Sequence, residues 1–397
     1  MAKINKVLIS AGKIILMGLF LIFLSSQQVL AQDDEIKALE EKMQILMEEV
    51  DALKEKQPEG NEKKLHFHGY GELHYNNTGE EGKNDKMDFH RMVIGWTYHF
   101  NDWIVLDAEV DFEHAATEME LEYAHISFLF SDAFNIRMGS MLMPVGYLNE
   151  FHEPTLFYSV ERPYVQNNVI PTTWQEGGVG IFGSPHPDLN YRLYLVGGLD
   201  ASKFKASSGI RKGRGKVASA KGDNLAVVGR IEYGGIPGLN LGISGYLGDA
   251  AQGDSALGDA TVSILEGDIR YRWKDLELTG LVVSVNVDDT DKINTKTGQV
   301  IGEEILGWYA EGAYHLGKSF LPENQDLVLF VRHEQFNTQK KVAASLTADP
   351  ANDRKVTTFG LTYFPIPQVA VKADLESWEN GAGTDWHQSN LGVAYMF

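Results

Sequence analysis

Apolar and polar residues alternate with a period of two along most of the chain after Lys64. In the segment 104–113, every second residue from Ile104 to Phe112 is apolar, and Asp107, Glu109, Asp111 and Glu113 lie between them. This alternation puts the two kinds of side chain on opposite faces of a β-strand. Segments of about ten such residues, separated by turns, are typical of membrane barrels. The pattern predicts sixteen strands, at 65–76, 87–100, 102–113, 118–130, 134–143, 177–184, 190–200, 224–233, 239–248, 261–273, 276–287, 304–316, 326–337, 355–364, 368–378 and 386–397.

The connections between these strands alternate between short and long. Short turns are expected at 101, 131–133, 185–189, 234–238, 274–275, 317–325 and 365–367, and longer polar loops at most other positions, apart from a brief one near 115–117. Bacterial barrels have this asymmetry, with short periplasmic turns and longer outer loops. We therefore predict an all-β fold, a 16-stranded antiparallel transmembrane β-barrel over residues 65–397.

The two faces of the strands differ in the same way throughout. In the last strand, Leu391, Val393, Tyr395 and Phe397 share one face. We expect apolar residues outside and charged residues inside around the whole barrel, with an aqueous channel in its centre. Aromatic residues beside the turns are expected to form an interfacial girdle; these are Tyr98, Phe100, Trp103, Tyr271, Trp273, Tyr363 and Phe364.

The residues before the barrel have other patterns. Residues 1–31 combine three lysines, an apolar run from Ile14 to Leu24 and a small-residue exit at Ala31, which predicts a signal peptide. In residues 32–57, apolar residues alternate in spacings of three and four, which predicts a short coiled-coil helix. It would mediate self-association or, alternatively, lie as a lone helix on the barrel or on peptidoglycan. Residues 58–64 are a predicted linker.

Composition excludes several classes of function. The chain has no cysteine, so disulfides, thiol chemistry and a lipoprotein anchor are excluded. Its formal charge is -20, and removal of Lys3, Lys6 and Lys13 with the signal peptide leaves 32 bases against 55 acids, or -23. General nucleic-acid binding needs clustered basic residues, so we do not expect it. No cofactor is predicted.

The connection at about 144–176 is far longer than the usual 4 to 6 residues and contains four prolines. It is the third outer loop of the predicted barrel. Its polar residues are candidates for lining a constriction; they are Asn149, Glu150, His152, Glu153, Glu161, Arg162 and Glu176.

Four stretches resemble the porin O/P family, the phosphate-selective-type outer-membrane porins. They are GYGELHYN at 69–76, NEFHEPTLFYSVERP from Asn149, IPTTWQEGGVGI from Ile170, and the terminal Tyr395-Met396-Phe397. The resemblance implies a trimeric, sixteen-stranded channel whose third loop folds inward. It also implies the outer membrane of a Gram-negative-type bacterium, with lipid and lipopolysaccharide around the barrel and the coiled coil in the periplasm. Phe397 would be read by the outer-membrane insertion machinery.

Ion selectivity depends on the charges that face the channel. The strand phase predicts that the lining residues are Arg91, Asp107, Glu109, Asp111, Glu120, Glu122, Arg137, Arg192, Arg230, Glu266, Asp268, Arg270, Arg272 and Glu311. Acids outnumber bases among them, which favours a general or cation-leaning pore for passive diffusion of ions and small hydrophilic solutes. The alternatives are a phosphate- or anion-selective porin, and a structural protein that uses its coiled coil for assembly or tethering.

The fourth outer loop is rich in basic residues, namely Lys203, Lys205, Arg211, Lys212, Arg214 and Lys216. It would concentrate anions at the mouth, bind phosphates of lipopolysaccharide, or simply be solvated.

Three other patterns are weak site signals. His66 and His68 share a strand face near the periplasmic rim, where polar residues are expected without a metal. His125 and Ser127 are expected on the outward face of their strand, without the third residue that an activated serine needs. Asp288, Asp289 and Asp291 suit an ordinary solvated loop as well as a calcium site. We predict no catalytic residue and no metal site.

Overall fold

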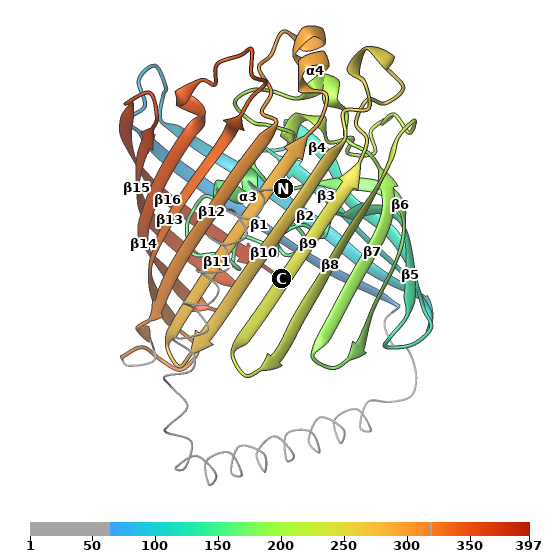
Figure 1. The fold of residues 1–397 in the computed structure, drawn as a ribbon. Coiled ribbons are helices and arrows are strands. Elements are labelled where there is room, and N and C mark those ends of the chain that lie inside the picture. The colour runs from blue at the N-terminus through green and yellow to red at the C-terminus, as the bar shows by residue number, and fades with distance from the viewer. Residues whose placement is uncertain (1–63, 318–319) are drawn as a thin grey trace, which may run out of the picture. The chain divides into compact units, whose positions relative to one another are not determined.

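The computed structural model describes residues 64–317 and 320–397, which form a closed barrel of sixteen antiparallel strands (Figure 1). This confirms the predicted fold class. The predicted signal peptide, the coiled coil and all but the last residue of the linker lie outside the described residues. The strands are β1 (Leu65–Thr78), β2 (Lys86–Asn101), β3 (Ile104–Glu113), β4 (Glu118–Leu129), β5 (Asn135–Leu142), β6 (Gln175–His186), β7 (Leu189–Gly197), β8 (Leu225–Ile236), β9 (Leu239–Gly248), β10 (Val262–Trp273), β11 (Leu276–Val287), β12 (Glu304–His315), β13 (Asp326–Lys341), β14 (Asp353–Ile366), β15 (Val369–Asn380) and β16 (Asp385–Met396).

The barrel closes where β1 pairs with β16. At this seam Gly69 donates its backbone N–H to the carbonyl of Phe397 at 3.0 Å and accepts one in return at 2.8 Å. A Cβ atom on Gly69 would lie 2.8 Å from the Phe397 ring and 2.4 Å from a backbone oxygen of Val93. Glycine is therefore required sterically at this position of the seam.

Long connections lie at one end of the barrel and short turns at the other (Figure 1). The long-loop end carries the helix α4 (Thr290–Thr297) and several single-turn 3-10 segments. No helix in residues 64–317 and 320–397 is long and apolar enough to cross a membrane.

The outer surface is apolar along the strands. Leu265, Val282, Val331 and Leu391 are each more than half exposed. Such a continuous apolar face is stable only when something apolar covers it, and a bilayer does so. At the short-turn end, the rings of Tyr98 and Phe100 pack edge to face, and Trp103 contacts Phe130, in a cluster of the kind expected for an aromatic girdle. The outer face thus follows the predicted alternation.

The inner face does not follow it everywhere. We expected charged residues inside around the whole barrel. This expectation is wrong for the parts of β7 to β12 that lie towards the long-loop end. Their inward side chains form a buried apolar cluster with the connection between β5 and β6; the strand residues include Val196, Val228, Tyr246, Ile264, Leu281, Val283, Val285, Ile305 and Tyr309. The inward apolar side chains are stable because protein, rather than water, covers them.

The expected outward position of His125 and Ser127 is also wrong. The register between β3 and β4 shifts at Glu122, which has no partner of its own in β3. This extra residue moves the following side chains to the other face of the strand. His125 therefore lines an interior cavity, and Ser127 accepts a hydrogen bond from Arg137 Nε at 3.1 Å.

The outward face of β11 allows a test of its lipid exposure. Val282 is near the middle of β11 and is 54% exposed. We predict that Val282→Arg lowers the free energy of unfolding from lipid vesicles by about 2–4 kcal/mol, as a cation near the bilayer midplane does. Val282→Leu is the control and should change it little; equal effects of the two variants would contradict lipid contact at this position.

Candidate functional site

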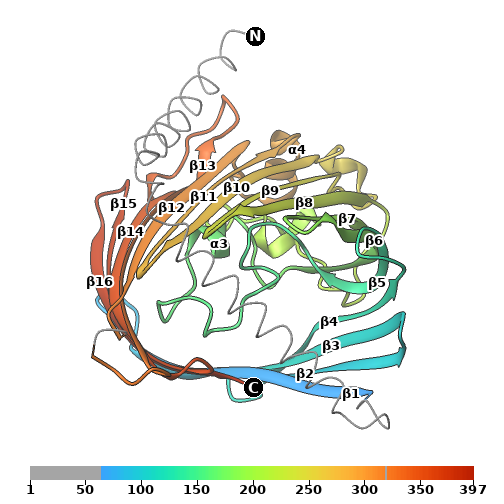
Figure 2. The same cartoon turned by 90° about the horizontal axis from the view of Figure 1, so that it is seen from below.

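The long connection between β5 and β6, residues 143–174, lies inside the barrel (Figure 2). We call it loop three. It starts one residue earlier than predicted and ends at Trp174, so Glu176 belongs to β6. Within it, the chain forms one short helix, α3 (Val165–Asn168). Most of the apolar side chains of loop three are fully buried, including Val145, Leu148 and Ile170.

Asn149 joins the two ends of loop three. Its amide nitrogen donates to the carbonyls of Met143 at 2.7 Å and Trp174 at 2.9 Å, and its oxygen accepts the Trp174 N–H at 3.0 Å. Asn149 is completely buried. It therefore stabilises the loop. The prediction that Asn149 lines the constriction is wrong, because its side chain does not reach solvent.

The far part of loop three is bound to charged groups on β13 and β15. Lys372 Nζ donates to the backbone carbonyls of Phe157 at 2.8 Å and Ser159 at 2.9 Å. Arg332 donates to Ser159 Oγ at 2.7 Å, and the Val160 N–H donates to an Asp374 carboxylate oxygen at 2.6 Å. These wall charges satisfy backbone groups and the Ser159 hydroxyl, which would otherwise be buried without partners.

Helix α3 is held at both ends. The N–H of Val165 donates to Glu334 Oε2 at 2.9 Å, and the carbonyl of Asn167 accepts from Arg211 at 2.7 Å. Gly307 in β12 leaves room for it, because a Cβ atom there would lie 2.9 Å from both Val165 and Val169. The helix is thus held against the wall by hydrogen bonds to charged side chains and by close packing on Gly307.

Strands β1 and β4 also bind loop three, through contacts that involve histidines. His152 Nε2 lies 2.9 Å from both Glu122 and the hydroxyl of Tyr70. Glu161 lies 3.3 Å from His74. Burial opposes ionisation of Glu161, but the hydrogen bond and charge of His74 outweigh it and lower the pKa of Glu161 to about 2. Loop three begins at β5, ends at β6 and reaches across the barrel to β13, β15 and β1.

The basic fourth loop, residues 198–224, also turns inward in part. Arg214 donates to the carbonyl of Thr173 at 2.9 Å, and Arg211 donates to that of Thr172 at 3.3 Å. Burial and the neighbouring Arg214 lower the pKa of Arg211 to about 9. The predicted outward course holds for Lys203, Lys205 and Lys212, which are exposed. It is wrong for Arg211 and Arg214, which turn inward and donate to carbonyls of loop three.

Three buried arginines pair with eight carboxylates of the wall. Arg91 forms ion pairs with Glu72, Asp111 and Glu113. Arg230 forms them with Glu232, Glu266 and Asp268, and Arg332 forms them with Glu311 and Glu334. Each of these eight carboxylates lies within 3.3 Å of an arginine, and the three arginines offset three of the eight formal negative charges.

Cavities lie on both sides of loop three. Two cavities of about 920 and 630 Å³ open towards the short-turn end, and we call them the short-turn cavities. Their charged lining holds five acids and three bases, namely Asp107, Asp132, Glu150, Asp188, Glu232, Arg137, Arg192 and Arg270. Glu150 of loop three binds Arg192 at 3.0 Å. Burial raises the pKa of Glu150, and Arg192 opposes that shift.

A third cavity of about 300 Å³, the long-loop cavity, lies between loop three, loop four and the first four strands. Its lining holds five acids and six bases, namely Glu72, Glu113, Glu118, Glu120, Glu161, Arg91, Arg162, Arg211, Lys212, Arg214 and Lys216. Arg162 donates to the carbonyl of His152 at 3.3 Å. The net formal charge of the lining therefore changes sign from one side of loop three to the other.

Most of the predicted residues line a cavity or lie in ion pairs within the barrel. Arg91, Glu120, Glu161, Arg162, Arg211, Lys212, Arg214 and Lys216 line the long-loop cavity, and Asp107, Arg137, Glu150, Arg192 and Arg270 line the short-turn cavities. Glu109, Asp111, Glu122, Arg230, Glu266, Asp268 and Glu311 lie in ion pairs within the barrel. His152 and Glu176 are buried in contacts of loops three and four, and Glu153 and Arg272 lie outside these cavities.

Sequence reasoning missed Arg332 and Glu334, which bind loop three. They are two residues apart on β13 and alternate with the outward residues Val331 and His333, and this spacing would have indicated an inward charged pair.

The Lys372 contacts predict a loss of stability. We expect Lys372→Met to lower the free energy of unfolding by about 1–3 kcal/mol, because the carbonyls of Phe157 and Ser159 lose their donor inside the barrel. Denaturant titration of the refolded barrel measures this. Lys355→Met, at an exposed position on β14, is the control and should change stability little; an equal loss in both variants would contradict the anchoring role.

Glu161 predicts a pH effect on stability. Its pKa in the folded chain, about 2, is below the ordinary value of 4.5, so its contribution is present above pH 4.5 and is lost as the pH falls to about 2. In Glu161→Gln, unfolding midpoints should fall less steeply across this window than in the unchanged chain. Parallel curves for the two proteins would contradict the His74–Glu161 contact.

No family model matches the sequence. An uncharacterized protein of Aquifex aeolicus (strain VF5) is 30% identical over 349 residues, which cover 83% of this chain and 79% of the relative.

Solved structures are similar at lower identity. An anion-selective porin from Comamonas acidovorans has a TM-score of 0.54 at 12% identity, over 84% of this chain and 99% of that chain. OmpF of Salmonella typhi, in complex with daunomycin, has a TM-score of 0.57 at 13% identity, and the outer membrane channel DcaP of Acinetobacter baumannii has one of 0.56 at 12%; each match covers 84% of this chain and 97% of the other. The chain therefore has the sixteen-stranded barrel fold of these porins, and it belongs to the same protein family as the Aquifex aeolicus relative.

Proposed function

We propose that this protein is an outer-membrane porin, through which ions and small hydrophilic solutes diffuse passively past loop three. The observation that carries the proposal is the position of loop three, which spans the interior of a closed barrel and has charged cavities on both sides. A loop bound to β1, β4, β13 and β15 narrows the passage to a fixed cross-section. Passive diffusion through it needs no covalent step.

The same geometry supports weak rather than strong ion selectivity. The short-turn cavities have two more acids than bases, and the long-loop cavity has one more base than acids. Ion pairs with Arg91, Arg230 and Arg332 offset part of the acidic charge of the wall. The pore is therefore general, with a small preference for cations that comes from its short-turn side.

One observation favours the alternative, an anion- or phosphate-selective porin of the porin O/P type. Arg162, Arg211 and Arg214 line the long-loop cavity and bond to backbone or threonine oxygens. Their positive charge is available to an anion that enters from this side, because guanidinium groups bind phosphate and carboxylate oxygens well. Preference for phosphate would require these three residues to outweigh the five acids beside them.

The apolar outer face supports a position in the outer membrane of a Gram-negative-type bacterium, with the short turns in the periplasm. We infer a homotrimer from the resemblance to porin O/P. A structural role for the predicted coiled coil, at residues 32–57, is the further alternative. Deleting those residues tests it: loss of the oligomer with unchanged conductance favours the porin.

Recordings from the refolded protein in a planar bilayer test the function and its selectivity. We expect stable single-channel steps and a reversal potential slightly on the cation side in a KCl gradient. Glu118→Gln should move the reversal potential towards anions, and Lys212→Gln should move it towards cations by a similar amount, because both exposed side chains line the long-loop cavity. Both shifts should shrink in 1 M salt, where the screening length falls to about 3 Å.

Lys274→Gln is the matched control, because Lys274 lies in the turn between β10 and β11, over the ring of Trp273. It should leave the reversal potential unchanged. An anion-side potential with block by phosphate would support the alternative. Absence of any conductance in protein that has refolded would contradict the porin.

A further inference from the structure

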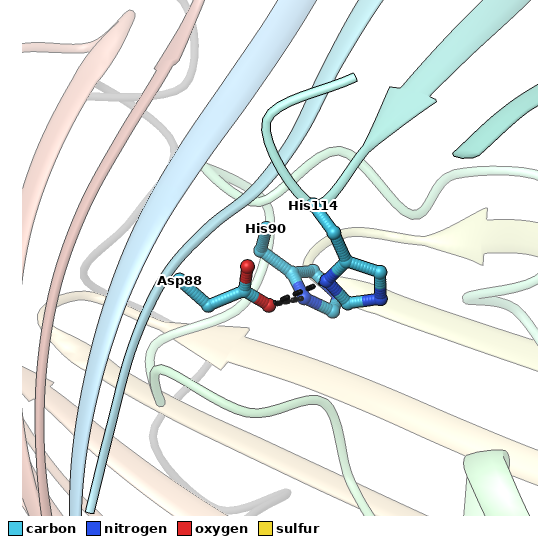
Figure 3. Close-up of side chains that lie close together, drawn as sticks. All are labelled: Asp88, His90 and His114. Atoms are coloured by element: carbon cyan, nitrogen blue, oxygen red, sulfur yellow. Dashed lines mark hydrogen bonds and ion pairs between the residues drawn. The ribbon is translucent and has the colours of Figure 1, made fainter. Parts of the chain in front are cut away.

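Asp88, His90 and His114 bring three metal-ligating groups together at the long-loop end of the barrel (Figure 3). Asp88 Oδ2 lies 2.7 Å from His114 Nδ1 and 3.3 Å from His90 Nδ1. One ligand atom from each residue lies within 4.8 Å of the other two. We propose that these three side chains bind one divalent transition-metal ion of the Zn²⁺ class.

A bulge in β2 and the turn between β3 and β4 bring the two histidines together. His90 is the extra residue of a bulge in β2, where the register with β1 shifts between Glu72 and Leu73. His114 begins the turn from β3 to β4 with a φ of 50°, in the left-handed region that is uncommon for residues other than glycine. Its backbone N–H donates to the carbonyl of His90 at 3.1 Å. This hydrogen bond keeps the two histidines adjacent, and their rings meet edge to face with centroids 5.6 Å apart.

The ligand set suits a borderline metal ion. Imidazole nitrogens and a carboxylate oxygen bind Zn²⁺ at about 2.0–2.2 Å, and three protein ligands leave a fourth tetrahedral position for water. Ca²⁺ and Mg²⁺ prefer oxygen ligands only, so two histidines disfavour them. The His114 side chain is 43% exposed and those of Asp88 and His90 are between 26% and 29% exposed, so an ion reaches the site from solvent and His114 has room to adjust.

The surroundings connect the site to the pore. His90 and His114 line the long-loop cavity. The ring of His90 stacks on that of His74 at 4.8 Å, and His74 lies against Glu161 of loop three. Arg91 approaches His90 Nε2 at 3.5 Å, but its charge is already paired with three carboxylates. A bound dication would thus lie on the cavity wall, one side chain away from a contact of loop three.

Equilibrium titration of Zn²⁺ into the untagged, refolded full chain in detergent tests the site, in competition with a chromophoric zinc chelator. We expect one saturable equivalent per chain. Asp88→Asn keeps the size of the side chain, and His114→Asn suits a positive φ; each should weaken binding at least tenfold. His387→Asn is the matched control, an exposed histidine in β16 at the same end of the barrel, and should bind as the unchanged chain does.

Binding to the first two variants with unchanged affinity, or no saturable binding to the unchanged chain, would overturn the proposal. Far-UV circular dichroism reports whether each variant keeps its strands. If a variant fails to fold, the absorption spectrum of Co²⁺ added to the unchanged chain decides: bands of a tetrahedral site with nitrogen ligands that saturate at one equivalent support the proposal, and their absence overturns it. None of these measurements depends on conductance, so the metal site and the porin function can fail separately.

Discussion

The need to satisfy buried polar groups of loop three determines the interior of this barrel. A loop that crosses a lumen brings backbone N–H and carbonyl groups away from bulk water, and each of them costs free energy unless it finds a partner. The wall provides these partners as charged side chains: Lys372 donates to loop carbonyls, and Asp374 and Glu334 accept from loop N–H groups. Arg332 donates to the hydroxyl of Ser159. Much of the lumen charge is therefore structural, and counting acids and bases overstates the charge that a solute meets.

Loop three also makes the interior asymmetric. Its apolar residues pack with the inward faces of β7 to β12, while its polar residues meet β1, β4, β13 and β15. Water-accessible space is left on two sides, with linings of opposite net charge. A solute would thus pass from one electrostatic environment into another. Loop four reinforces this arrangement, because Arg211 and Arg214 contribute both to the position of loop three and to the charge beside it.

Much of the fold followed from the period of two alone, because each strand alternates between lipid and interior whatever its tertiary partners are. The strand number and the alternation of connection lengths needed nothing further. The prediction of side-chain direction failed where the period of two is interrupted. Glu122 is one extra residue in β4, and it reverses the faces of His125 and Ser127. A single sequence does not mark such a bulge.

The candidate site was less accessible to prediction for a related reason. The inward course of Arg211 depends on the carbonyl of Asn167, more than forty residues away in the chain. The grouping of His90 with His114 depends on a bulge and a left-handed turn in two strands. Local patterns predict which residues are polar and which face of a strand they occupy. The contacts between long loops depend on residues that are far apart in the sequence and meet only in the folded barrel.

The seam between β1 and β16 has a consequence for the synthesis of the chain. Gly69 and Phe397 are 328 positions apart (397 minus 69), and they meet only when the sixteenth strand has emerged from the ribosome. Until then, the growing polypeptide has two open sheet edges, which lipid does not tolerate and which favour aggregation. Insertion into a bilayer therefore has to follow translation, and the nascent chain has to be kept unfolded until the partner of its first strand has been made.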